Sequence, residues 1–174
     1  MRFKYLNNIS KAILFAPLLI YVGQRSYIAY DEGFYTLQAK WILQNNNWII
    51  PLWWDKYILD RTIGIQFLIA KSQQLLGETS FVAHLPTTIS AGLMLFFTYK
   101  LHQQLINKKD AIISPIILAT TYIWLDFSHL ATQDMVFACL VTLAIYTLTK
   151  LNKETNHLYE FVFCLLYTSP SPRD

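Results

Sequence analysis

The chain has 174 residues, of which 54% are hydrophobic, 16% aromatic and only 14% charged, whereas charged residues make up about 25% of a typical soluble domain. Fourteen Lys and Arg against eleven Asp and Glu give a net charge of +3, too small and too scattered for a nucleic-acid-binding module. The aromatic content excludes a disordered chain, and two cysteines are too few for a disulfide framework or a zinc site. The composition therefore indicates a membrane protein.

The last eleven residues, 164–174, match codon for codon the conceptual translation of a transposon-library sequencing adapter. The alternative is a natural polar tail that follows a last helix. We set these residues aside before reasoning about the fold. The predicted transmembrane domain therefore covers residues 1–163, and we expect the natural sequence to continue beyond Phe163.

Four stretches are apolar over the length that crosses a bilayer, which is about 20 residues. They are residues 9–29, 81–101, 111–127 and 132–149. The first has no small-residue cleavage site after its apolar run, which favours a retained span over a signal peptide. Basic residues gather near the N-terminus and after the second and fourth stretches, so the positive-inside rule places the N-terminus in the cytoplasm.

The outer loop of residues 30–80 has the pattern of two amphipathic helices. In residues 32–45 an aromatic-rich face recurs at helical spacing, and Asn45-Asn46-Asn47 ends the helix. Residues 62–76 form the second predicted helix, with Gly77 placed to cap its end. The expected faces are Phe34, Leu37, Trp41 and Gln44 in the first helix, and Ile65, Leu68, Ile69, Ser72, Leu75 and Leu76 in the second. Since three tryptophans lie between the helices, we interpret the loop as two helices lying at the headgroup level.

Two adjacent carboxylates, Asp31 and Glu32, stand where the first span leaves the membrane. Carboxylates beside an apolar surface are costly to desolvate unless they have a use. The structural alternative is that Asp31 caps the following helix while Glu32 interacts with the helix dipole. Both interpretations are compatible, because a cap also fixes a carboxylate in place.

Three further polar groups face the same side of the membrane. Asp60 and Arg61 precede the second amphipathic helix, with Lys56 and Tyr57 nearby. An Arg at this level can hold a phosphate with two hydrogen bonds, or it can form a local salt bridge or headgroup contact. Asp134 opens the fourth span from the outside. An acid at the edge of a span is a functional candidate, and its structural alternative is a helix cap.

The sequence contains no nucleotide-phosphate loop, no G-x-S-x-G motif and no dinucleotide-binding fingerprint. An enzyme working on the outer side needs an activated substrate that is already there. This favours a lipid-linked donor over a nucleotide sugar.

The order of these motifs resembles the first outer loop of the GT-C membrane glycosyltransferases that use polyprenyl-phosphate sugars. That class includes protein O-mannosyltransferases and lipid A aminoarabinose transferases. The resemblance covers about residues 10–150, and the motifs that carry it are Asp31-Glu32-Gly33-Phe34-Tyr35, Trp48-Ile49-Ile50-Pro51, Asp60-Arg61 and Leu76-Gly77. It implies an all-α fold of multi-pass transmembrane helices with two interfacial helices in a long first outer loop.

The resemblance also implies roles for individual residues. Asp31 and Glu32 correspond to the catalytic pair, in which Asp31 takes the proton of the acceptor hydroxyl and Glu32 shapes the site. Arg61 corresponds to the basic residue that contacts the lipid phosphate. Asp60, Lys56, Tyr57 and Asp134 then complete the substrate site. Two departures matter: Thr62 replaces the usual Pro, and Phe34 stands where aminoarabinose transferases often carry Arg.

The resulting hypothesis is sugar transfer at the outer face of the cytoplasmic membrane, with the N-terminus inside. The partners are a polyprenyl-phosphate sugar donor, a lipid, glycan or protein acceptor and membrane lipids, with no nucleic acid. No metal ligands are predicted, and the need for a divalent cation is left open. The alternatives are a multi-pass transporter or channel, whose polar residues belong near the bilayer midplane, and a scaffold without catalysis.

Overall fold

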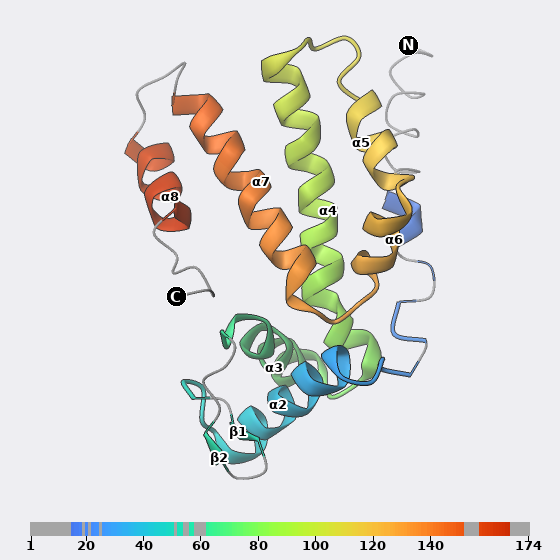
Figure 1. Ribbon diagram of the computed structural model, residues 1–174, viewed down its shortest axis with the longest axis vertical. Helices are drawn as coiled ribbons and strands as arrows, with labels where there is room; N and C mark the ends of the chain where they lie inside the picture. The colour runs from blue at the N-terminus through green and yellow to red at the C-terminus, as the bar shows by residue number, and fades with distance from the viewer. Residues whose placement is uncertain are drawn as a thin grey trace.

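The computed structural model describes residues 15–18, 20, 22–24, 26–50, 52–53, 56–57, 62–151 and 157–167. Helices dominate this part of the chain (Figure 1). Two long helices, α4 (Ser80–Leu105) and α7 (Gln133–Leu151), lie side by side and begin at the same end of the molecule. Both are long and apolar enough to cross a membrane, and they match the predicted stretches 81–101 and 132–149.

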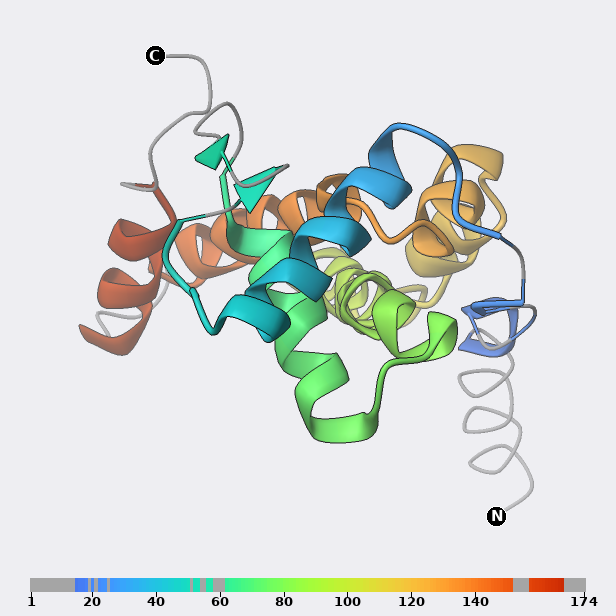
Figure 2. The same ribbon diagram turned by 90° about the horizontal axis from the view of Figure 1, so that it is seen from below.

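Two shorter helices, α2 (Asp31–Asn45) and α3 (Gly64–Leu76), pack against each other across the end where α4 and α7 begin. Figure 2 shows this pair from below, in front of the long helices. Their bounds match the two helices predicted in the loop of residues 30–80. A two-stranded antiparallel hairpin, β1 (Leu52–Trp53) and β2 (Lys56–Tyr57), connects them.

The ends of α2 and α3 follow the local signals in the sequence. Asn46 closes α2 in the left-handed conformation, with φ of 51°. Gly77 follows α3 with φ of 96° and donates its backbone N–H to Gln73 O at 2.9 Å. A positive φ suits Asn and Gly because both tolerate the left-handed region.

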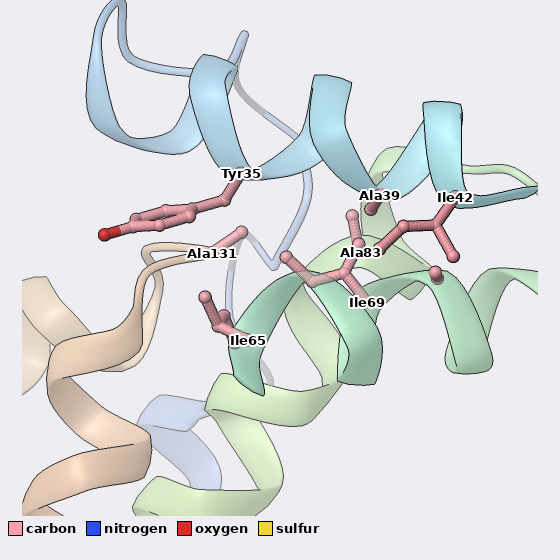
Figure 3. Close-up of a cluster of buried hydrophobic side chains, with 8 residues drawn as sticks. Tyr35, Ala39, Ile42, Ile65, Ile69, Ala83 and Ala131 are labelled. Atoms are coloured by element: carbon pink, nitrogen blue, oxygen red, sulfur yellow. The ribbon is translucent and has the colours of Figure 1, made fainter. Parts of the chain in front are cut away.

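The core between α2 and α3 is small and apolar (Figure 3). Tyr35 reaches over the loop before α7, where it lies above Ala131. The buried residues of this cluster are Tyr35, Ala39 and Ile42 from α2, Ile65, Ile69 and Ala70 from α3, Ala83 from α4, and Ala131. The residues expected to face the headgroup level lie mostly outside this cluster. On α2, Phe34, Leu37 and Trp41 are half-buried and Gln44 is exposed. On α3, Leu68, Leu75 and Leu76 are exposed.

One polar contact crosses this core. The side-chain amides of Gln38 and Gln66 lie 2.8 Å apart, and both residues are at most 1% exposed. The other amide atom of Gln66 lies 3.0 Å from Thr62 O and 3.2 Å from Ile63 O, the geometry of an N–H that donates to both carbonyls. The contact between the two amides joins α2 to the first turn of α3.

The region expected as a single span over residues 111–127 consists of two short helices, α5 (Ile113–Ala119) and α6 (Tyr122–Ser128). The break falls at two adjacent threonines. Thr120 donates its hydroxyl to Ile116 O at 3.0 Å, and Thr121 donates to Ile117 O at 2.9 Å. Because these side chains bond to the preceding turn, they compete with the helical backbone, and Thr121 is extended, with ψ of 127°.

The first predicted span, residues 9–29, lies partly outside the described residues, which here are 15–18, 20, 22–24 and 26–29. Residues 15–18 are helical, but residues 20, 22–24 and 26–30 are not, so the helix does not continue to Ala29. Gly23 has φ of 67°, and a Cβ placed on it would lie 2.5 Å from the backbone N and Cα of Phe81. The chain therefore crosses the start of α4 at a distance that only glycine permits.

The last helix, α8 (His157–Tyr167), packs against α7.

A Gly23→Ala substitution tests this close approach. We expect it to lower the free energy of unfolding by about 2 kcal/mol or more, because alanine adds both a steric clash and a strained φ. Thermal unfolding in detergent measures the effect. Gly92→Ala is the matched control, because a Cβ there meets side-chain atoms at ordinary distances of 3.6–3.8 Å. Equal stability of the two variants would contradict the packing of Gly23 against α4.

Candidate active site

The start of α2 is fixed by the carboxylate of Glu32, which is fully buried. Glu32 Oε2 accepts the backbone N–H of Ile28 at 2.8 Å. Its Oε1 accepts the backbone N–H of Ala131 at 2.7 Å and lies 3.0 Å from His84 Nε2. A single side chain thus joins the turn before α2, the first turns of α4 and the loop before α7.

His84 completes this arrangement from α4. Its Nδ1 lies 2.7 Å from Ser80 O, its ring stacks on Tyr27 with centroids 5.7 Å apart, and the residue has no exposed surface. Both ring nitrogens therefore lie within hydrogen-bonding distance of an oxygen atom. The contact with Glu32 is a buried hydrogen bond between a ring nitrogen and a carboxylate oxygen.

The protonation of Glu32 follows from two opposed effects. Burial raises the pKa of its carboxyl, because the charged form loses its water. The hydrogen bonds from His84, Ile28 and Ala131 favour the charged form and outweigh burial, so the pKa of Glu32 lies below its usual value of 4.5. Glu32 is therefore an anion with both oxygens engaged, and sequence analysis alone did not identify His84 as its partner.

Asp31 directly precedes this anchor and is exposed in the first turn of α2. The cap position belongs to Tyr30, whose side chain makes no capping hydrogen bond. The capping alternative considered for Asp31 is thus not what the structure shows. Tyr30 has φ of 80° and ψ of −78° and is 92% exposed. This backbone conformation is strained for any residue with a Cβ.

Asp134 lies in the first turn of α7 and is exposed. It lines two hollows, one on each side of the helix. The smaller, of about 390 Å³, is apolar and lies among α4, α5, α6 and α7, with Met94, Trp124 and Met135 in its wall. The larger, of about 520 Å³, lies between α3 and α7. The start of α7 is again not capped by this acid, because the helix begins one residue earlier, at Gln133.

The larger hollow has a polar end and an apolar remainder. Its polar lining residues are Thr62, Gln133 and Asp134, and its apolar ones are Ile65, Phe67, Leu68, Val136, Phe137 and Leu140, with Gly64 at the start of α3. Thr62 directly follows Arg61 in the chain. A Cβ placed on Gly64 would meet no atom within 4 Å, so the space above this glycine is open.

Several predicted site residues lie elsewhere or outside the described residues. Asp60 and Arg61 are outside them, so the structure says nothing of their positions. Lys56 is exposed in the hairpin and lines neither of the two hollows, whereas the side chain of Tyr57 lies outside the described part of the structure. Asp31 also lines neither hollow. A hydrogen bond connects the segments that carry Asp31 and Asp134: Glu32, the residue after Asp31, accepts the N–H of Ala131, which lies three residues before Asp134.

Sequence analysis did not single out His129, which the structure gives two backbone contacts. Its Nε2 lies 3.0 Å from Pro17 O and its Nδ1 lies 2.8 Å from Leu125 O. It thereby connects the helical residues 15–18 to the end of α6. Within the described ranges, no three His, Cys, Asp or Glu side chains converge in a way that could hold a metal ion.

Comparison with known proteins identifies the family of the chain. The sequence profile of the family "Dolichyl-phosphate-mannose-protein mannosyltransferase" matches residues 60–168. The chain belongs to this family. Membership confirms the resemblance to GT-C glycosyltransferases that the motifs of the outer loop indicated, and it fits the two helices of membrane-spanning length. A search of curated proteins finds no match.

The fold of this family member is also that of two solved structures. One is the crystal structure of ArnT from Cupriavidus metallidurans bound to undecaprenyl phosphate, with 12% identity and a TM-score of 0.83 over 92% of this chain. The other is the same protein in the apo state, with equal identity and TM-score over 95% of this chain. The chain spans about a third of the length of these proteins, 31% and 32% respectively.

The lowered pKa of Glu32 gives a prediction for stability against pH. The contribution of Glu32 is fully present above about pH 4.5 and is lost as the pH falls through its lower folded-state pKa. We expect Glu32→Gln to cost about 3–5 kcal/mol at neutral pH, because it breaks a buried pair, and to reduce the further loss of stability on acidification. Thermal unfolding in detergent between about pH 7 and pH 3 measures both effects.

Glu160→Gln is the matched control, because Glu160 also pairs with a histidine, His157 at 3.2 Å, but on the surface. That variant should unfold like the wild type across the whole range. An unchanged acid response in Glu32→Gln would contradict the charged state assigned to Glu32.

Proposed function

We propose that this chain carries part of the active site of a membrane glycosyltransferase that moves a sugar from a polyprenyl-phosphate donor to an acceptor on the outer side of the cytoplasmic membrane. The observation that carries this proposal is the hollow between α3 and α7, which is polar at Thr62, Gln133 and Asp134 and apolar along the rest of its length. A polyprenyl-phosphate sugar has the same division between a charged head and an apolar chain. ArnT, whose fold the chain shares, is a protein seen with undecaprenyl phosphate bound.

In the proposed arrangement, the head of the donor lies at the polar end of this hollow and its chain runs along Phe137 and Leu140. Arg61, next to Thr62 in sequence, binds the phosphate and stabilises the charge that grows there during transfer. Asp60 orients Arg61. Asp134 contacts the sugar.

The reaction is a substitution at the anomeric carbon. Asp31 accepts the proton of the acceptor hydroxyl while its oxygen forms a bond to the anomeric carbon. The bond between that carbon and the phosphate oxygen breaks, and polyprenyl phosphate leaves with the electron pair. The acceptor is a lipid, a glycan or a protein.

A transporter or channel remains the second class to compare. Asp31 lies in the first turn of α2 and Asp134 in the first turn of α7. The helix α7 begins at the end of the molecule where α2 and α3 pack against each other. Polar residues of a conduction path belong near the middle of the spans. The enzyme therefore accounts better for the placement of these carboxylates.

Replacing Asp31 by Asn removes the proposed base and keeps the size of the side chain. We expect transfer by the full-length protein to fall by about 10²-fold or more, with unchanged abundance in the membrane. Transfer is measured in detergent with a radiolabelled polyprenyl-phosphate sugar. The control is Asp126→Asn, an exposed acid at the end of α6. Wild-type turnover in Asp31→Asn would remove Asp31 from the mechanism.

A Gly64→Val substitution tests the donor site. The new side chain has open space in the hollow, so the protein should fold normally while the donor is partly displaced. We expect KM for the donor to rise about tenfold with kcat little changed, since uniform binding is lost. Ser72→Val places the same side chain on the same helix, about two turns away, and should leave KM unchanged. Equal donor KM in the two variants would rule out this hollow as the donor site.

A further inference from the structure

We infer that His84 is a positioning residue for the reaction, holding Asp31 and Asp134 in a fixed relation through the buried carboxylate of Glu32. The inference rests on the proposed function and extends it to a histidine that lines neither of the two hollows around Asp134. Its basis is the geometry of one carboxylate bonded to three separate segments.

The first half of the argument concerns the turn before Asp31. Tyr30 has a positive φ of 80°, a strained conformation for a residue with a Cβ. Three bonds close this turn: Ile28 N–H to Glu32 Oε2 at 2.8 Å, Gly33 N–H to Ile28 O at 3.1 Å and Phe34 N–H to Tyr30 O at 3.1 Å. The ring of Tyr30 is 92% exposed, so packing of its side chain does not offset the strain. The surrounding hydrogen bonds therefore maintain the strained backbone of Tyr30, the residue directly before Asp31.

The second half concerns Asp134. The oxygen of Glu32 that faces His84 also accepts the N–H of Ala131. Ala131 is itself fully buried, and it is followed within three residues by Asp134 in the first turn of α7. The two oxygens of one carboxylate thus fix the backbone before each of the two acids.

His84 determines whether the carboxylate of Glu32 can hold the backbone before Asp31 and before Asp134. The ring is itself fixed, by Ser80 O on one nitrogen and by the stacked ring of Tyr27. Without His84, Oε1 of Glu32 loses a hydrogen-bond donor inside a site with no exposed surface, which is costly for a buried anion. The carboxylate then protonates or turns away, and the bonds that hold the strained turn and the Ala131 loop are lost together.

The expected consequence is kinetic. A misplacement of about 1 Å at a catalytic group can cost about 10²-fold in rate, whereas a donor site between α3 and α7 does not contact His84. We therefore expect His84→Phe to lower kcat by about 10²-fold per folded molecule and to change KM for the donor by less than roughly twofold. His84→Gln keeps an N–H donor for Glu32 and should restore part of kcat.

The matched control is His102→Phe, the same change on the same helix about 27 Å away by helical rise, where His102 Nδ1 lies 2.6 Å from Ser114 Oγ. Its kcat should equal that of the wild type. Hydrogen exchange supplies a readout independent of activity: the amides of Ile28 and Ala131 should exchange faster in His84→Phe and not in His102→Phe. Normal kcat in folded His84→Phe, or a loss of thermal stability alone, would overturn the inference.

A second variant keeps the test decisive if His84→Phe does not fold. Tyr30→Gly leaves the buried bonds in place and removes the strain, so its thermal stability should be equal to or above that of the wild type, while kcat falls because the turn before Asp31 loosens. Wild-type kcat in that variant would overturn the inference. If wild-type protein transfers no sugar while the amides exchange as expected, the proposed function fails and the role of His84 in fixing the backbone stands.

Discussion

The arrangement of this chain depends on keeping one carboxylate charged where water does not reach. An ionised Glu is stable in such a place only if both oxygens receive hydrogen bonds, and Glu32 receives them from α4, from the turn before α2 and from the loop before α7. In the same order, these donors lie 52, 4 and 99 residues from Glu32 in sequence. The need to satisfy one anion therefore brings together the beginnings of three helices, which is where the acidic residues of the candidate site stand.

Much of the fold follows from local signals in the sequence. The bounds of α2 and α3 could be predicted because apolar residues recur at helical spacing and Asn46 and Gly77 end the helices in positive-φ conformations. The two long helices could be predicted because the composition of a span is distinctive. The break between α5 and α6 was missed, since two threonines within an apolar run are common in spans, and their bonds to the preceding turn depend on side-chain rotamers.

The candidate site was less predictable than the fold, because its central contacts join residues far apart in the chain. Asp31, Glu32 and Asp134 could be identified by their positions at the edges of apolar stretches. Their partners could not, because nothing in the local sequence around His84 or Ala131 distinguishes them. The residues that α2 buries against α3 could not be predicted either, because apolar residues surround the helix, and only the position of α3 selects Tyr35, Ala39 and Ile42.

The amide pair between Gln38 and Gln66 has a mechanical consequence. Two amides that satisfy each other inside an apolar layer can separate only by leaving buried polar atoms without partners, a penalty of about 1–3 kcal/mol per group. Sliding of α2 along α3 is opposed by the same penalty. The two helices therefore move as one rigid body. A displacement of the first turn of α3, beside the larger hollow, also displaces α2 and with it the end that carries Asp31.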